Sequence, residues 1–130
     1  MERTHRIILS DALLPVQVFF NAISDNSFIR ILKGFSAGVG AGFDIAACTF
    51  PGDLDEYEDP LAGIEFSLPD GESVILSFHD FFDILIQVCS VYMQDHPEDE
   101  TVIKELQDKI KKLISEPNSP VFLPGHNVEI

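Results

Sequence analysis

The sequence predicts an α+β fold in which about four helices cover a small, largely antiparallel sheet made of a hairpin and one or two further strands. Three observations support this fold class. Apolar residues recur at helical spacing in four segments, they alternate at period two around a Pro-Asp-Gly turn, and glycines cluster between the two patterns. The chain has 130 residues, 45% of them hydrophobic, so we expect residues 1–130 to bury one core as a single globular domain.

Two helices are expected in the N-terminal quarter of the chain. Pro15 suits the first turn of a helix that carries Phe20 on its apolar face. The polar residues 25–27 interrupt this pattern and can cap a second helix, whose apolar face begins at Phe28. Residues 1–9 predict a strand or an extended arm.

The strands are expected in the middle of the chain. The glycine-rich residues 34–42 end the second helix and allow a close backbone approach, and residues 43–50 predict a buried strand. Residues 63–68 alternate between apolar and polar side chains, and residues 72–76 return as their partner strand. Between them, residues 69–71 place Pro and Gly where a tight turn needs them.

Two further helices and a tail complete the prediction. Ser77 can cap the third helix, which ends near residues 95–96, and Pro97 opens the fourth. Residues 117–130 form a C-terminal tail that we expect to be partly ordered at best. Within it, residues 121–123 can dock on the core, and the segment after them is expected to be loose.

Acidic residues dominate the charge of the chain. There are 22 Asp and Glu against 8 Lys and Arg, which gives a net charge of −14. No Lys or Arg lies between Gly34 and Ile103, a span that holds 15 of the 22 acids. This charge argues against direct binding to nucleic acid or to an anionic membrane surface. We also find no apolar stretch long enough for a transmembrane helix and no signal-peptide pattern, and we expect a cytoplasmic protein.

The densest acidic segment runs from Asp53 to Asp59, where five acids surround Tyr57. An acidic run is usually a solvated surface that aids solubility. Here we favour a surface that meets a basic partner, because complementary potential speeds association and sets the partner's register. Tyr57 supports this interpretation, since Tyr is a common anchor at interfaces.

We expect no catalytic residue, no cofactor and no metal. The glycine-rich segment lacks the third glycine of a dinucleotide-binding motif and follows a helix, not a strand. The acidic run departs from a calcium-binding EF-hand at its sixth and twelfth positions. His79 and His96 are better explained as capping or surface residues than as zinc ligands. Cys48 and Cys89 predict buried, unreactive thiols in a reducing compartment.

A longer block of residues carries a family resemblance. Residues 47–57 (Ala-Cys-Thr-Phe-Pro-Gly-Asp-Leu-Asp-Glu-Tyr), with Pro60 and the segment Gly63–Phe66, resemble the immunity proteins of bacterial contact-dependent growth inhibition (CDI) systems. In particular, they resemble the group that neutralises ribonuclease toxins. The following helix with Tyr92, and its continuation through residues 96–99, fits the same pattern.

The resemblance implies a small cytoplasmic protein without catalysis of its own, which binds the C-terminal toxin domain of a cognate CdiA effector. Related toxins cleave transfer RNA and some need elongation factor Tu, so this factor is implied as a further component of the complex. The resemblance covers roughly residues 44–113, and it leaves out the glycine-rich segment and the tail.

Nine residues form the predicted toxin-binding site, the acids through charge pairing and Tyr57 as an anchor. The main patch consists of Asp53, Asp55, Glu56, Tyr57, Glu58 and Asp59. The second-line candidates on the hairpin are Glu65, Asp70 and Glu72. Two other function classes stay open: an acidic nucleic-acid mimic that blocks another nucleic-acid-binding protein, and a small hydrolase that uses two carboxylates. A homodimer through an exposed apolar helix face is a further option.

Overall fold

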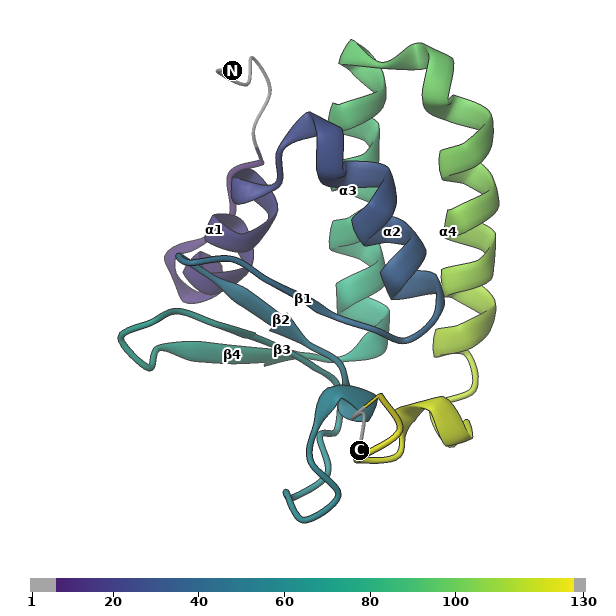
Figure 1. Ribbon diagram of the computed structural model, residues 1–130. Helices are drawn as coiled ribbons and strands as arrows, with labels where there is room; N and C mark the ends of the chain where they lie inside the picture. Colours follow the sequence, from purple (N-terminus) through teal and green to yellow (C-terminus); the bar gives the residue numbers. More distant parts are fainter. Residues whose placement is uncertain (1–6, 128–130) are drawn as a thin grey trace.

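The computed structural model describes residues 7–127 (Figure 1). Within this range the helices are α1 Leu14–Ala22, α2 Phe28–Ser36, α3 Phe78–Asp95 and α4 Glu100–Ile114. The strands are β1 Ala41–Gly42, β2 Ala47–Thr49, β3 Ile64–Ser67 and β4 Ser73–Leu76. The predicted α+β class is confirmed. None of these helices combines the length and the apolar character that a membrane crossing requires.

The four strands form one antiparallel sheet in the order β1-β2-β3-β4. Cys48 of β2 lies opposite Phe66 of β3, and both side chains are buried. The next row, Thr49, Glu65 and Ile75, lies on the other face of the sheet, where Ile75 is 51% exposed. Figure 1 shows the helices on one side of the sheet, so the row with Glu65 belongs to the uncovered side.

Phenylalanine rings fill the space between the sheet and the helices. Phe19 of α1 lies with its ring centroid 5.5 Å from that of Phe66. Phe50, just after β2, contacts Phe35 of α2 at 5.3 Å and Phe81 of α3 at 5.6 Å. All five side chains have no exposed surface. Because the rings come from the sheet and from three helices, their burial fixes the helices on the sheet.

The strand assignment differs from the prediction in the glycine-rich region. The edge strand β1 lies inside that region, where no strand was predicted. The strand predicted over residues 43–50 is reduced to Ala47–Thr49. The reason is a turn that the Phe43 N–H closes by donating to the Ala46 carbonyl at 2.7 Å, so that β1 and β2 form a hairpin.

The helix ends follow the predicted positions with two differences. Ser77 caps α3 as predicted, its Oγ accepting a backbone N–H of the first turn at 3.1 Å. Pro97 opens a 3-10 turn, and α4 begins after that turn. Residues 25–27 also form a 3-10 turn, but Ser27 does not cap α2 through its side chain. Asp25 bonds to His96 instead.

The C-terminal segment, residues 120–127, returns to the end of the sheet where α3 begins (Figure 1). Phe122 is only 6% exposed, and its ring stacks on that of Phe78 with centroids 5.0 Å apart. Docking of residues 121–123 is therefore confirmed for Val121 and Phe122, which pack on the core. Leu123 remains 60% exposed.

Candidate functional site

The acidic loop, residues 55–60, projects from the end of the sheet where β3 begins (Figure 1). Tyr57 at its tip is 89% exposed. Four carboxylate side chains around it are also exposed: Asp55, Glu56, Glu58 and Asp59. Within residues 7–127, no Lys or Arg side chain forms an ion pair with them. The loop therefore presents four negative charges and an aromatic ring to solvent.

Two of these carboxylates also fold the loop into a tight turn. Asp55 Oδ1 accepts a hydrogen bond from the Tyr57 N–H at 3.1 Å, and Glu58 Oε2 accepts one from the Asp55 N–H at 3.1 Å. The Glu58 N–H donates to the Asp55 carbonyl at 3.0 Å and closes the turn. A loop that is ordered before its partner arrives loses less entropy on binding.

Asp53 has a different environment from the loop acids. Its Oδ2 accepts hydrogen bonds from the N–H groups of Gly40 and Phe50, each at 2.9 Å. Its Oδ1 accepts one from the Asn127 side-chain amide at 2.9 Å. The half-buried carboxylate thus ties the start of the loop to the β1 side of the sheet and to the C-terminal segment. A contact between Asp53 and a toxin stays a prediction.

The C-terminal segment adds backbone hydrogen bonds to the same junction. The Asn127 N–H donates to the Gly52 carbonyl at 2.9 Å, and the Gly125 N–H donates to the Leu54 carbonyl. Gly125 has a φ of 89°, which a residue with a side chain rarely adopts. The segment after residue 123 was expected to be loose; these bonds hold it as far as Asn127, and residues 128–130 lie outside the described residues.

The predicted hairpin acids lie apart from the acidic loop. Asp70 and Glu72 are exposed at the β3–β4 turn, where Asp70 Oδ1 accepts the Glu72 N–H at 2.8 Å. Figure 1 places this turn and the acidic loop at opposite ends of β3. Glu65 lies between them on the uncovered face of the sheet and is half-buried. Of the nine predicted residues, the structure therefore groups five, Asp55 to Asp59, on one surface.

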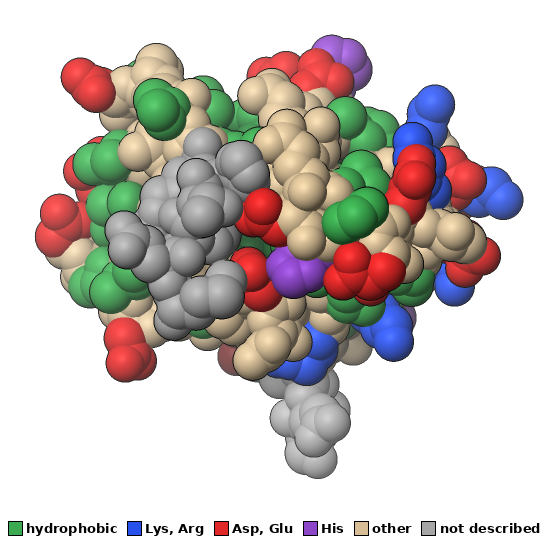
Figure 2. Space-filling view, turned by 90° about the horizontal axis from the view of Figure 1, so that it is seen from above, with side chains coloured by type: hydrophobic (Ala, Val, Ile, Leu, Met, Phe, Trp, Pro, Cys, Tyr) green, Lys and Arg blue, Asp and Glu red, His purple; other side chains and the backbone are tan. Residues whose placement is uncertain are grey.

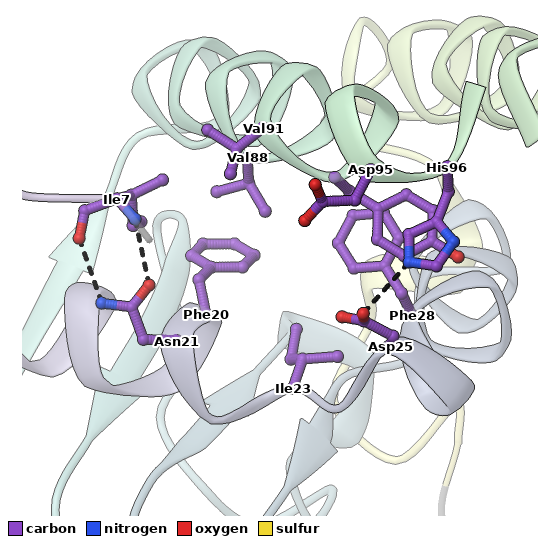
Figure 3. Close-up of a pocket in the computed structure, with 11 residues that line it drawn as sticks. Ile7, Phe20, Asn21, Ile23, Asp25, Phe28, Val88, Val91, Asp95 and His96 are labelled. Carbon is purple, nitrogen blue, oxygen red and sulfur yellow. Dashed lines mark hydrogen bonds and ion pairs between the residues drawn. The ribbon is translucent and has the colours of Figure 1, made fainter. Parts of the chain in front are cut away.

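A second polar cluster occupies the opposite end of the molecule, where α3 ends and α1 passes into α2 (Figure 3). His96 Nε2 lies 3.0 Å from Asp25 Oδ2. The Tyr92 hydroxyl donates to Asp99 Oδ2 at 2.8 Å. The Tyr92 ring stacks between His96, at 4.4 Å, and Phe28, at 4.2 Å. This cluster fastens the end of α3 to the α1–α2 connection.

Electrostatics at this end follow from the same contacts. The hydrogen bond to Asp25 raises the pKa of His96. Burial, together with the hydrogen bond to Asp99, raises the pKa of Tyr92 well above its ordinary value. His96 is the C-cap of α3, as predicted, and its side chain in addition ties this end of the helix to the α1–α2 connection. Figure 2 looks onto this end and shows Lys and Arg side chains toward the α4 side of the face.

The cavity at this end does not suit a hydrolase. Asp25 and Asp95 both line it, beside apolar side chains such as Phe20 (Figure 3). Its volume is about 10 Å³, which is room for one water molecule. A hydrolase with two carboxylates needs a cleft that admits its substrate.

Two groups of His and acid side chains have ligand atoms within 4.8 Å of one another in the described part of the chain. They are His79, Asp80 and Asp83, and His96, Glu98 and Asp99. The first group is fully exposed, and the second already uses His96 and Asp99 in the contacts above. The expectation of no bound metal stays a prediction.

A family model described as "CDI immunity protein" matches residues 12–107. The chain belongs to the CDI immunity protein family. No curated protein matches the chain. This membership indicates that the chain neutralises a cognate toxin, and it confirms the resemblance at the level of the family.

The CDI immunity match includes the acidic loop and the hairpin but ends within α4. The C-terminal segment, which holds the base of the acidic loop, lies beyond the match. Sequence reasoning missed this role of Asn127 and the pairing of Asp25 with His96. Both contacts join residues more than 70 positions apart, so no local pattern predicts them.

Proposed function

We propose that this CDI immunity protein neutralises a ribonuclease toxin in the cytoplasm by laying the acidic loop over the toxin's basic groove. One observation carries the proposal: four exposed carboxylates without a basic partner in the described chain surround Tyr57, which is 89% exposed. The inhibition is by binding, with no catalysis by the immunity protein.

The chemistry of a ribonuclease explains this arrangement. Such an enzyme holds RNA phosphates with Lys and Arg. An inhibitor that places carboxylates in the same groove meets those cations and excludes the substrate. Tyr57 provides the aromatic anchor that often contributes most to binding. Elongation factor Tu enters the proposal as a component that binds through the toxin, since some related toxins need it.

The test is to reverse two loop charges together, D55K/E56K, and to measure binding to the toxin domain encoded by the reading frame immediately upstream. Truncating one partner of a desolvated charge pair costs about 2–5 kcal/mol, so we expect the Kd to rise at least about 30-fold. Cells that express the toxin should lose protection in parallel. The variant should unfold close to the wild-type denaturant concentration, since both side chains are exposed and the loss of the hydrogen bond from the Tyr57 N–H to Asp55 is offset by reduced charge repulsion in the loop.

The matched control is E105K/D108K, which makes the same charge change at exposed positions of α4. Its Kd for the toxin should lie within about threefold of the wild-type value, because salt screens the interaction between the toxin and exposed charges far from the contact. Equal effects of the two double variants would show that only total charge matters. If the wild-type chain formed no complex at low salt, the proposal would fail and the nucleic-acid mimic would become the better hypothesis.

A further inference from the structure

A groove of about 360 Å³ lies beside the acidic loop. One wall is formed by Pro60, Leu61 and Ala62, which lead from the loop into β3. The other wall is formed by residues 117–119 and 122–124, which include the exposed Leu123. The lining contains no charged side chain. This size is at the lower end of the roughly 300–1,000 Å³ that is usual for binding pockets.

Proline residues and a stacked ring pair restrict the conformation of the groove's lining. Four prolines line it, and each fixes its own φ: Pro51, Pro60, Pro117 and Pro124. Phe78 and Phe122, which also line the groove, stack with ring centroids 5.0 Å apart. Gly52 lets the 3-10 turn Pro51–Asp53 approach the C-terminal segment, because a Cβ at this position would lie 2.1 Å from the Val121 carbonyl oxygen. A groove that is already formed in the free chain loses little conformational entropy when a partner binds in it.

Acidic residues stand at the start of both walls. Asp59 directly precedes Pro60, and Glu116 directly precedes Pro117; both acids are exposed. A second copy of this chain would bring the same acids against them, so like charges oppose a dimer through this groove. A partner's apolar side chain with Lys or Arg beside it would match both the uncharged lining of the groove and the acidic residues at its rim.

We propose that this groove receives an apolar side chain of the toxin that is flanked by the cations the acidic loop contacts. This inference rests on the proposed function and adds the apolar centre of the interface to its charged part. Tight interfaces commonly combine an apolar anchor in a pocket with a polar rim. Tyr57 and the groove then supply the apolar contacts of an interface whose charged contacts come from the loop carboxylates.

The experiment compares two groove variants with two controls. A62W fills the groove, and L123S removes an exposed apolar side chain from its wall. A12W makes the same substitution as A62W, and I45S makes one comparable to L123S, at exposed positions away from the groove. The Kd for the upstream-encoded toxin domain is measured for each variant at low and at high salt, and thermal unfolding confirms that each variant is folded.

We expect A62W and L123S each to raise the Kd about tenfold or more, by the same factor at both salt concentrations, because apolar contacts are not screened. The D55K/E56K defect should shrink at high salt. The groove assignment is overturned if A62W and L123S bind like A12W and I45S while D55K/E56K still weakens binding. A wild-type chain that binds no toxin overturns the proposed function itself, and the groove assignment with it.

Discussion

At the α3–α4 end, Asp25 and Asp99 accept hydrogen bonds from His96 and Tyr92, whereas at the loop end four carboxylates lie in solvent with no basic partner in the described chain. The two ends also differ in what holds them. Aromatic stacking fastens the α3–α4 end, and backbone hydrogen bonds to the C-terminal segment fasten the loop end.

This contrast separates carboxylates that stabilise the fold from carboxylates that are available to a partner. Clustered exposed charges repel one another and lower the stability of the folded chain. The rigid base under the loop keeps them in place despite this cost. We therefore expect substitutions at the two ends to affect different measurements: stability at the α3–α4 end and at Asp53, and toxin affinity at the acidic loop.

Asp53→Ala and Asp55→Ala should give opposite phenotypes, although the two residues are two positions apart. D53A removes the acceptor of two backbone N–H groups and of the Asn127 amide, so it should lower the free energy of unfolding by about 3 kcal/mol. D55A should lower it by less than about 0.5 kcal/mol but weaken toxin binding. Urea unfolding and toxin titration distinguish them. Equal losses of stability would refute the division between Asp53 and the loop.

Asp25→Asn should lower stability by about 1–2 kcal/mol at pH 5.5 and by less at pH 9. Asp25 raises the pKa of His96, and Glu98 adds to this at 3.4 Å. In the unfolded chain the pKa of His96 is about 6.5, and in the folded chain it is higher. The stabilisation from protonated His96 is therefore complete below about pH 6.5 and is lost as the pH rises through the folded-state pKa. Urea unfolding at the two pH values measures it. A loss that does not change with pH would mean that the charge of His96 is irrelevant.

Tyr92→Phe should lower the free energy of unfolding by about 1 kcal/mol, because it removes only the hydrogen bond to Asp99. The ring remains stacked on His96 and Phe28, so the toxin affinity should equal that of wild type. Urea unfolding and toxin titration are the measurements. Loss of toxin binding without loss of stability would move the interface to the α3–α4 end.

The smallest effect is expected at the two cysteines. Cys48 and Cys89 are buried, and burial raises the pKa of both thiols, that of Cys89 to about 11. A thiol reagent at pH 8 should therefore modify neither residue in the folded chain and both in denaturant. Rapid labelling of the folded chain would show that the core opens around the centre of β2 or the interior of α3.

Local patterns predicted the parts of the fold that depend on local chemistry. The β3–β4 hairpin follows from alternation and from Gly71, which has a φ of 95°, and α3 follows from its apolar spacing and the Ser77 cap. The short edge strand β1 was not predictable, since two residues pair there only because Gly40 lets the backbone approach Cys48.

The candidate site was predictable in composition but not in geometry. The acids of residues 53–59 stand out in the sequence, yet only the fold separates the clamped Asp53 from the exposed Asp55. Besides the nearby Phe50 N–H, the clamp on Asp53 uses Gly40 and Asn127, which lie 13 and 74 positions away. Likewise, the hairpin acid Asp70 is close in sequence to the loop but lies at the other end of β3.

We propose that the toxin binds at the loop end, and hydrogen exchange of the chain with and without the upstream-encoded toxin domain shows which end is covered. We predict that amides of residues 54–62 and 117–125 become protected in the complex, while those of residues 23–28 and 92–99 exchange as in the free chain. Protection confined to residues 23–28 and 92–99 would contradict the account and assign toxin binding to the α3–α4 end.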